Sequence, residues 1–185
     1  EFRRVLFRSL VARQAGARAV DFLFDYISVS TYWTILLIVH GLFAIALLGA
    51  LTHQGLSVLT PVRAPAGGFV TRFRAVQGAS YATAICVLWV LTFLMGAWIY
   101  IKYRVYVRVP IERAGFWKTQ GFFELKEHVA TIGLVLLPAY WYLWTNSRSS
   151  QYAGARKWVT VLLAAICWFS FLVGHVVNNV RGFGS

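Results

Sequence analysis

A chain of 185 residues that is 59% hydrophobic and only 13% charged is too apolar for a soluble domain, in which about a quarter of the residues carry charge. The formal net charge of +12 would suit a nucleic-acid binder, but the cations lie between long uncharged stretches instead of in a basic run within a soluble fold. Cys86 and Cys167 both lie in apolar runs, which excludes a disulfide framework and a thiolate metal site. We therefore expect an integral membrane protein with no nucleic-acid partner.

The first thirty residues are expected to precede the membrane domain. The chain begins Glu1-Phe2 and has no methionine before Met95, so residues 1–14 are interpreted as a cloning scar or a disordered segment. Residues 15–30 place apolar side chains at spacings of three and four, with charged side chains on other faces. This pattern predicts an amphipathic helix that lies at the membrane interface.

Four long apolar stretches follow, and each is long enough to cross a hydrocarbon core, which takes about 20 helical residues. They lie at about 31–51, 79–102, 121–145 and 157–180. The third must include Glu124, Lys126 and Glu127 to span comfortably, whereas the interiors of the other three carry no charged residue. The sequence predicts an all-α protein, an integral membrane four-helix bundle over residues 31–181.

The distribution of cations predicts the orientation of this bundle. The N-terminal segment, the second loop with Lys126 and the C-terminal tail together carry twelve Lys and Arg, and the first and third loops carry six. Because cations resist translocation, we expect both termini to be cytoplasmic, in a bacterial inner membrane. Cations at headgroup level also predict contact with anionic lipids.

Three histidines are the main candidates for function, because polar groups at membrane depth are costly and often functional. His40 lies about nine residues inside the first predicted span, and His128 and His175 lie near the cytoplasmic ends of the third and fourth. Neutral imidazoles bind haem iron, copper, zinc or non-haem iron, and two of them on facing helices can hold a haem b. We favour His128 with His175, with His40 paired to either as the alternative, and expect His53 to be a solvated loop residue.

In its four spans, transmembrane histidines and basic cytoplasmic face, the chain resembles the four-helix membrane cytochromes of b type. The resemblance implies one haem b with two histidine ligands, and electron exchange with a quinol or a partner redox protein. The chain departs from paired histidines fourteen apart on one helix, since His40 and His53 are thirteen apart and face different directions. Asn178 could hydrogen-bond a cofactor or cap its helix, and Arg104 could bind haem propionates, a quinone headgroup or an anionic lipid.

Two other functions stay open. Glu124 and His128 are four apart and share a helical face, with Glu127 beside them. Together with His40 and His175 they would suit zinc, copper or non-haem iron, in a metal-dependent membrane enzyme such as an oxidoreductase. Alternatively, the histidines only satisfy hydrogen bonds in a noncatalytic accessory or assembly subunit of a larger membrane complex or a homo-oligomer.

Overall fold

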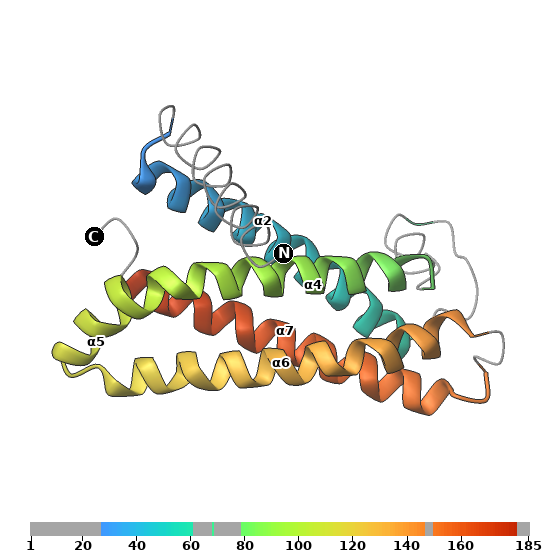
Figure 1. The fold of residues 1–185 in the computed structure, drawn as a ribbon. Helices are drawn as coiled ribbons and strands as arrows, with labels where there is room; N and C mark the ends of the chain where they lie inside the picture. Colours follow the sequence, from blue (N-terminus) through green and yellow to red (C-terminus); the bar gives the residue numbers. More distant parts are fainter. Residues whose placement is uncertain (1–26, 61–67, 69–78, 147–149, 181–185) are drawn as a thin grey trace, which may run out of the picture. The chain divides into compact units, whose positions relative to one another are not determined.

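The computed structural model describes residues 27–60, 68, 79–146 and 150–180, and in this part of the chain the regular elements are helices, with no strand (Figure 1). The prediction of an all-α protein is confirmed. In chain order the elements are α2 (Val29–Leu59), α4 (Ala79–Tyr103), the π-helix η1 (Arg104–Arg108), α5 (Val109–Arg113), α6 (Trp117–Thr145) and α7 (Ala153–Val180).

Within the described residues, three helical stretches are long and apolar enough to cross a membrane, which supports the assignment as a membrane protein. They are α2, the continuous run Ala79–Arg113 and α7. Helix α6 is 29 residues long, but its first half carries four charged side chains and it is not among the three. Those charged residues are Lys118, Glu124, Lys126 and Glu127.

The chain divides within α2 into two compact units, residues 1–37 and 38–185. In the first unit, the Ser28 hydroxyl accepts a hydrogen bond from the backbone N–H of Thr31 at 3.1 Å, so Ser28 caps the start of α2. The segment 1–14 lies outside the described residues. So does most of the expected interfacial helix over 15–30, of which Val29 and Ser30 belong to α2.

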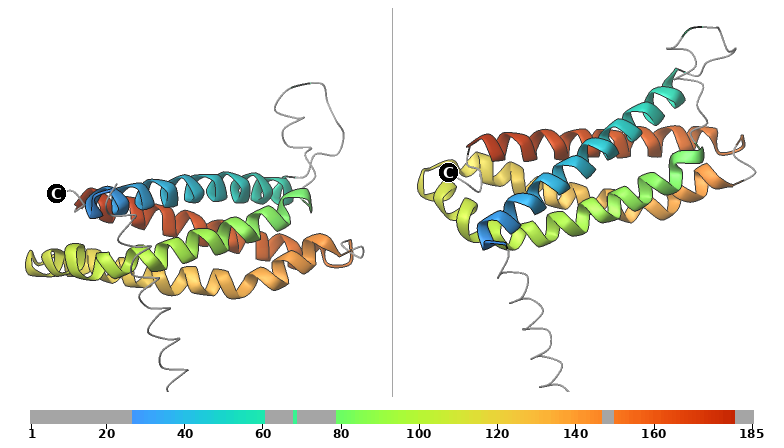
Figure 2. Two further views of the ribbon diagram at one scale, coloured as in Figure 1. Left: turned by 45° about the horizontal axis from the view of Figure 1, so that its top comes forward. Right: turned by 90° about the horizontal axis from the view of Figure 1, so that it is seen from above.

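In the second unit, α6 packs along both α4 and α7 (Figures 1 and 2). The chain reverses between α4 and α6 through η1 and α5. Pro110 lacks an N–H group and its ring crowds the carbonyl four residues earlier, which explains why the wider π-turn precedes it. After α5, Gly115 adopts a φ of 80°, and the N–H groups of Gly115 and Phe116 bond back to Glu112 and Ile111, ending the helix in a Schellman motif.

Among the described residues, the apolar core of the second unit consists of two separate clusters. The larger one joins α2, α4, α6 and α7 and contains Leu47, Leu48, Leu51, Ala82, Ile85, Trp89, Leu137, Tyr140, Leu163, Ile166 and Cys167. The smaller one lies at the η1 end and contains Tyr103, Val107, Ile111, Phe123 and Val177. On α4, α6 and α7, the stretch between the two clusters carries polar side chains that face inward, and these define the site below.

The expectation that His53 lies in a solvated loop is wrong. Helix α2 continues past Leu51 to Leu59, and His53 is half-buried, with its ring edge-on to Tyr81 at 5.8 Å between centroids. The neighbouring Gln54 is fully buried and accepts a hydrogen bond from the Tyr140 hydroxyl. The polarity of Gln54 is therefore satisfied inside the protein, and the polar pair His53-Gln54 does not mark the end of the helix.

Candidate functional site

His40 lies on α2, and its imidazole occupies a space that Gly96 of α4 leaves open. A β-carbon at position 96 would lie 3.2 Å from His40 Cε1, which is tighter than ordinary van der Waals contact. The ring also lies within hydrogen-bonding reach of the backbone of Thr92, which is one turn before Gly96 on α4. His40 Nδ1 is buried and has no hydrogen-bond partner among the described residues.

An ion pair from α6 faces this imidazole. Lys126 Nζ lies 2.6 Å from Glu127 Oε1 and 4.2 Å from the centroid of the Phe123 ring. The Lys126 side chain is only 16% exposed, because Lys126 shares a helical face with the buried residues Phe123 and Gly133. Both charges act electrostatically on His40.

Two hydroxyl groups complete the inward-facing polar side chains in this stretch. Thr92 Oγ1 on α4 and Ser170 Oγ on α7 are buried and, within the described residues, make no hydrogen bond. A buried polar group without a partner is costly, so such groups usually bind water or a ligand. We name His40, Thr92, Lys126 and Glu127 the polar layer, to which α2, α4 and α6 all contribute.

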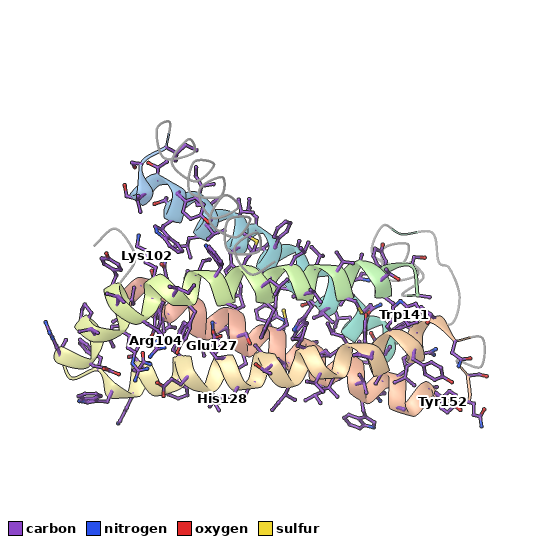
Figure 3. The ribbon with its side chains drawn as sticks, viewed as in Figure 1. Lys102, Arg104, Glu127, His128, Trp141 and Tyr152 are labelled. Carbon is purple, nitrogen blue, oxygen red and sulfur yellow. The ribbon has the colours of Figure 1, made fainter. Side chains whose placement is uncertain are left out.

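The structure does not bring the three expected histidine ligands together. His128 is exposed, and its Nδ1 lies 2.7 Å from the backbone carbonyl of Glu124 on its own helix. Figure 3 shows Glu127 on the side of α6 that faces α4 and α7, and His128 on the opposite side. His175 is also exposed, and its ring is parallel to that of Phe171 with centroids 6.4 Å apart. Of these three histidines, His40 alone faces inward.

The carboxylates proposed as further metal ligands are engaged with other groups. Glu124 Oε1 accepts a hydrogen bond from Gln120 at 3.0 Å and lies 3.2 Å from Arg108 Nη1, while Glu127 is paired with Lys126. Across the described ranges, no group of three or more His, Cys, Asp and Glu side chains could hold a metal ion. The arrangement therefore gives no support to a zinc, copper or non-haem iron centre.

The residues present do not fit a haem held inside the protein between His128 and His175, because both rings lie on exposed faces. The two other expected cofactor contacts, Arg104 in η1 and Asn178 near the end of α7, are exposed as well. One observation does suit a metal ligand. The bond from His128 Nδ1 to a backbone carbonyl leaves Nε2 available, which is how ligating imidazoles are usually oriented.

A polar network around η1 was not foreseen from the sequence. The Tyr103 hydroxyl donates to Gln120 Oε1 at 2.6 Å, Gln120 donates to Glu124, and Arg108 bridges Glu124 and Glu112. Tyr103 and Gln120 are buried. The i,i+4 spacings of Arg108 with Glu112 and of Gln120 with Glu124 were the signals available in the sequence.

Hydrogen bonds between tryptophan and threonine join the helices at the other end of the second unit. Each indole N–H donates to a threonine hydroxyl, at distances of 3.0 to 3.1 Å: Trp144 to Thr160, Trp168 to Thr52 and Trp141 to Thr83. We call these three contacts, together with Gln54 and Tyr140, the clamped end. Figure 3 shows Trp141 and Tyr152 at this end, away from Lys102 and Arg104.

The chain matches no protein-family model, and no curated protein or solved structure is significantly similar to it.

Proposed function

We propose that the protein is a multi-pass membrane protein that binds and releases a proton at His40. The observation that carries this proposal is the buried Nδ1 of His40, which makes no hydrogen bond within the described residues, beside the Lys126–Glu127 ion pair. Imidazole is the side chain that gains or loses a proton near neutral pH, and ionisable groups at membrane depth are typical of proton relays. The role fits a carrier or a subunit of a larger membrane complex.

The neighbours of His40 supply a physical basis for coupling. The neutral imidazole takes up a proton that comes from water, and the imidazolium that results is repelled by Lys126 and attracted by Glu127. Charging of His40 therefore favours a shift of the Glu127 carboxylate from Lys126 towards the imidazole. No charged residue of α4 or α7 acts on His40, so within the described residues this pair is its electrostatic environment.

The experiment is histidine-selective isotope labelling and NMR of the full chain in lipid nanodiscs, between about pH 5 and pH 9. We expect one set of ring resonances, lost in His40→Gln, to titrate in this range. Lys126→Met and Glu127→Gln should shift the midpoint of that titration in opposite directions, because they remove opposite charges. The proposal would be refuted by His40 resonances that stay constant with pH, or by a titration midpoint that neither substitution shifts. His128→Gln is the control, since His128 points away from the polar layer.

For the fold, we propose that α6 is a fourth membrane span, so that α2, α4, α6 and α7 form a four-helix bundle with both termini on the cytoplasmic side of a bacterial inner membrane. The support is the packing of α6 along α4 and α7, together with the pairing of its charged residues Glu124, Lys126 and Glu127. Single cysteines at Ala114 and Ser150, before and after α6, should react with an impermeant maleimide from opposite sides of the membrane. Reaction of both from the same side would contradict a spanning α6.

A second candidate is the electron-transfer function expected from the sequence, with haem b, and a quinol or a redox protein as partner. It is favoured by the orientation of His128, whose Nε2 is not engaged by the bond to Glu124. A bound haem would supply one-electron exchange. Purified protein should then show a Soret band and a pyridine haemochrome that disappear in His128→Ala and persist in His53→Ala. Absence of the band in the unmodified chain would exclude this candidate.

A further inference from the structure

The charges at the η1 end of the second unit do not balance. Between positions 102 and 127 the chain carries six cations and three carboxylates, Glu112, Glu124 and Glu127. Glu112 and Glu124 both pair with Arg108, and Glu127 pairs with Lys126. The ion pairs therefore use every carboxylate of the described residues but only two of the six cations.

Three of the remaining cations are exposed and form no ion pair with any described residue. They are Arg104 in η1, Arg113 at the end of α5 and Lys118 in the first turn of α6. We name these three residues the basic turn. Lys102 differs, because its Nζ lies over the Tyr106 ring at 5.6 Å from the centroid.

Large apolar side chains are exposed within the same turn. Tyr106 is 62% exposed, Phe116 54% and Trp117 64%. Aromatic side chains of this kind favour the boundary between lipid headgroups and hydrocarbon. The helical stretch Ala79–Arg113 is long and apolar enough to span; Arg104 and Arg113 lie within its last ten residues, and Lys118 follows it. These cations therefore fall near the level of the phospholipid phosphates.

We propose that the basic turn binds the headgroup of an anionic phospholipid of the surrounding bilayer. Arg104, Arg113 and Lys118 together attract the anionic headgroup, while the acyl chains lie against the exposed aromatic side chains. Arg108 takes no part in this binding, because Glu112 and Glu124 already occupy its guanidinium. The proposal is independent of protonation at His40.

The test measures lipid selectivity at the protein boundary by electron spin resonance. The full chain is reconstituted in phosphatidylcholine vesicles that contain spin-labelled phosphatidylglycerol or spin-labelled phosphatidylcholine. The unmodified chain should prefer phosphatidylglycerol. Arg113→Gln should reduce that preference by up to about fivefold, and Arg104→Gln with Arg113→Gln and Lys118→Gln should abolish it, because each cation near a charged surface contributes about 1 kcal/mol.

The matched control is the double variant Arg108→Gln with Glu112→Gln. It removes one cation and one carboxylate that already neutralise each other, so the preference for phosphatidylglycerol should stay unchanged. Circular dichroism confirms that each variant keeps its helices. An undiminished preference in the triple variant would overturn the proposal. So would loss of the preference on adding inorganic phosphate at constant ionic strength, because the ligand would then be free phosphate.

Discussion

Two sets of polar side chains in the second unit differ in how their hydrogen-bonding groups are satisfied. At the clamped end, Gln54 pairs with Tyr140, and three indoles donate to threonine hydroxyls. In the polar layer, His40 Nδ1 and Thr92 Oγ1 make no hydrogen bond with any described residue. Only the first set joins its helices by direct side-chain hydrogen bonds.

The difference indicates separate roles for the two sets. A paired buried polar group stabilises modestly, and losing one partner leaves the other group with an unmet desolvation cost. An unpaired group contributes little to stability in the first place, so its retention calls for another reason. We therefore expect substitutions at the clamped end to change the free energy of unfolding, and those in the polar layer to change chemistry.

The largest loss of stability is expected at Gly133, which lies against Trp89 of the larger core cluster. A β-carbon there would overlap the Trp89 ring, which is buried in the larger core cluster. Gly133→Leu should lower the free energy of unfolding by about 3 kcal/mol, the upper part of the range for overpacking, as measured by unfolding in mixed detergent micelles. Gly174→Ala is the control, because nothing lies within 4 Å of a β-carbon there and alanine favours the helix. Equal losses in the two variants would contradict the packing at Trp89.

The next largest effect is expected at Gln54. Gln54→Leu should cost about 1 to 2 kcal/mol, because it leaves the Tyr140 hydroxyl buried without its partner. Adding Tyr140→Phe should recover part of the loss, and the double-mutant cycle measures the coupling. Purely additive losses would mean that the hydrogen bond contributes no stability.

A smaller effect is expected where the polar layer meets α4. Gly96→Ala places a methyl group against His40 Cε1, so the ring must shift by a few tenths of an ångström. We expect a loss below about 1 kcal/mol, within the usual range for a slightly overpacked site. The chemical shifts of the His40 ring should change. They should stay the same in Gly121→Ala, because nothing lies within 4 Å of a β-carbon at position 121. Unmoved resonances in Gly96→Ala would show that the ring does not lie at this glycine.

The smallest change in stability is expected at His40 itself. His40→Leu should alter the free energy of unfolding by less than about 0.5 kcal/mol, or increase it, since a buried polar group without a partner is replaced by an apolar one. The same variant should lack the titrating signal of the proposed proton site. A loss of stability as large as that of Gln54→Leu would show that His40 stabilises the fold. The expected difference in role between the polar layer and the clamped end would then be wrong.

Long apolar stretches and the position of His40 could be read from the sequence, because length and composition decide whether a helix can span. Which face of α6 points inward could not be predicted from the sequence. In lipid both faces of a helix are apolar, so composition does not reveal that Lys126 faces the core and that His128, turned by about 200°, points away. This is why the expected set of three histidines was not found assembled.

The contacts at the clamped end could not be predicted from the sequence for a different reason. Gln54 and Tyr140 lie far apart in the chain, so the pair exists only once the helices are packed together. The π-turn, by contrast, had a local signal in Pro110. Local sequence patterns thus predict features within one helix. Hydrogen bonds between side chains on different helices depend on tertiary structure, which such patterns do not give.

The contact between His40 and Gly96 also has a mechanical consequence. The imidazole fits into a notch on α4 that exists because position 96 lacks a side chain, and one turn away in either direction stand Thr92 and Tyr100. Axial sliding of the helix that bears His40 would push the ring against one of these larger residues. The contact at Gly96 therefore fixes the axial position of α2 relative to α4. It does so through a single ring, which can also carry charge.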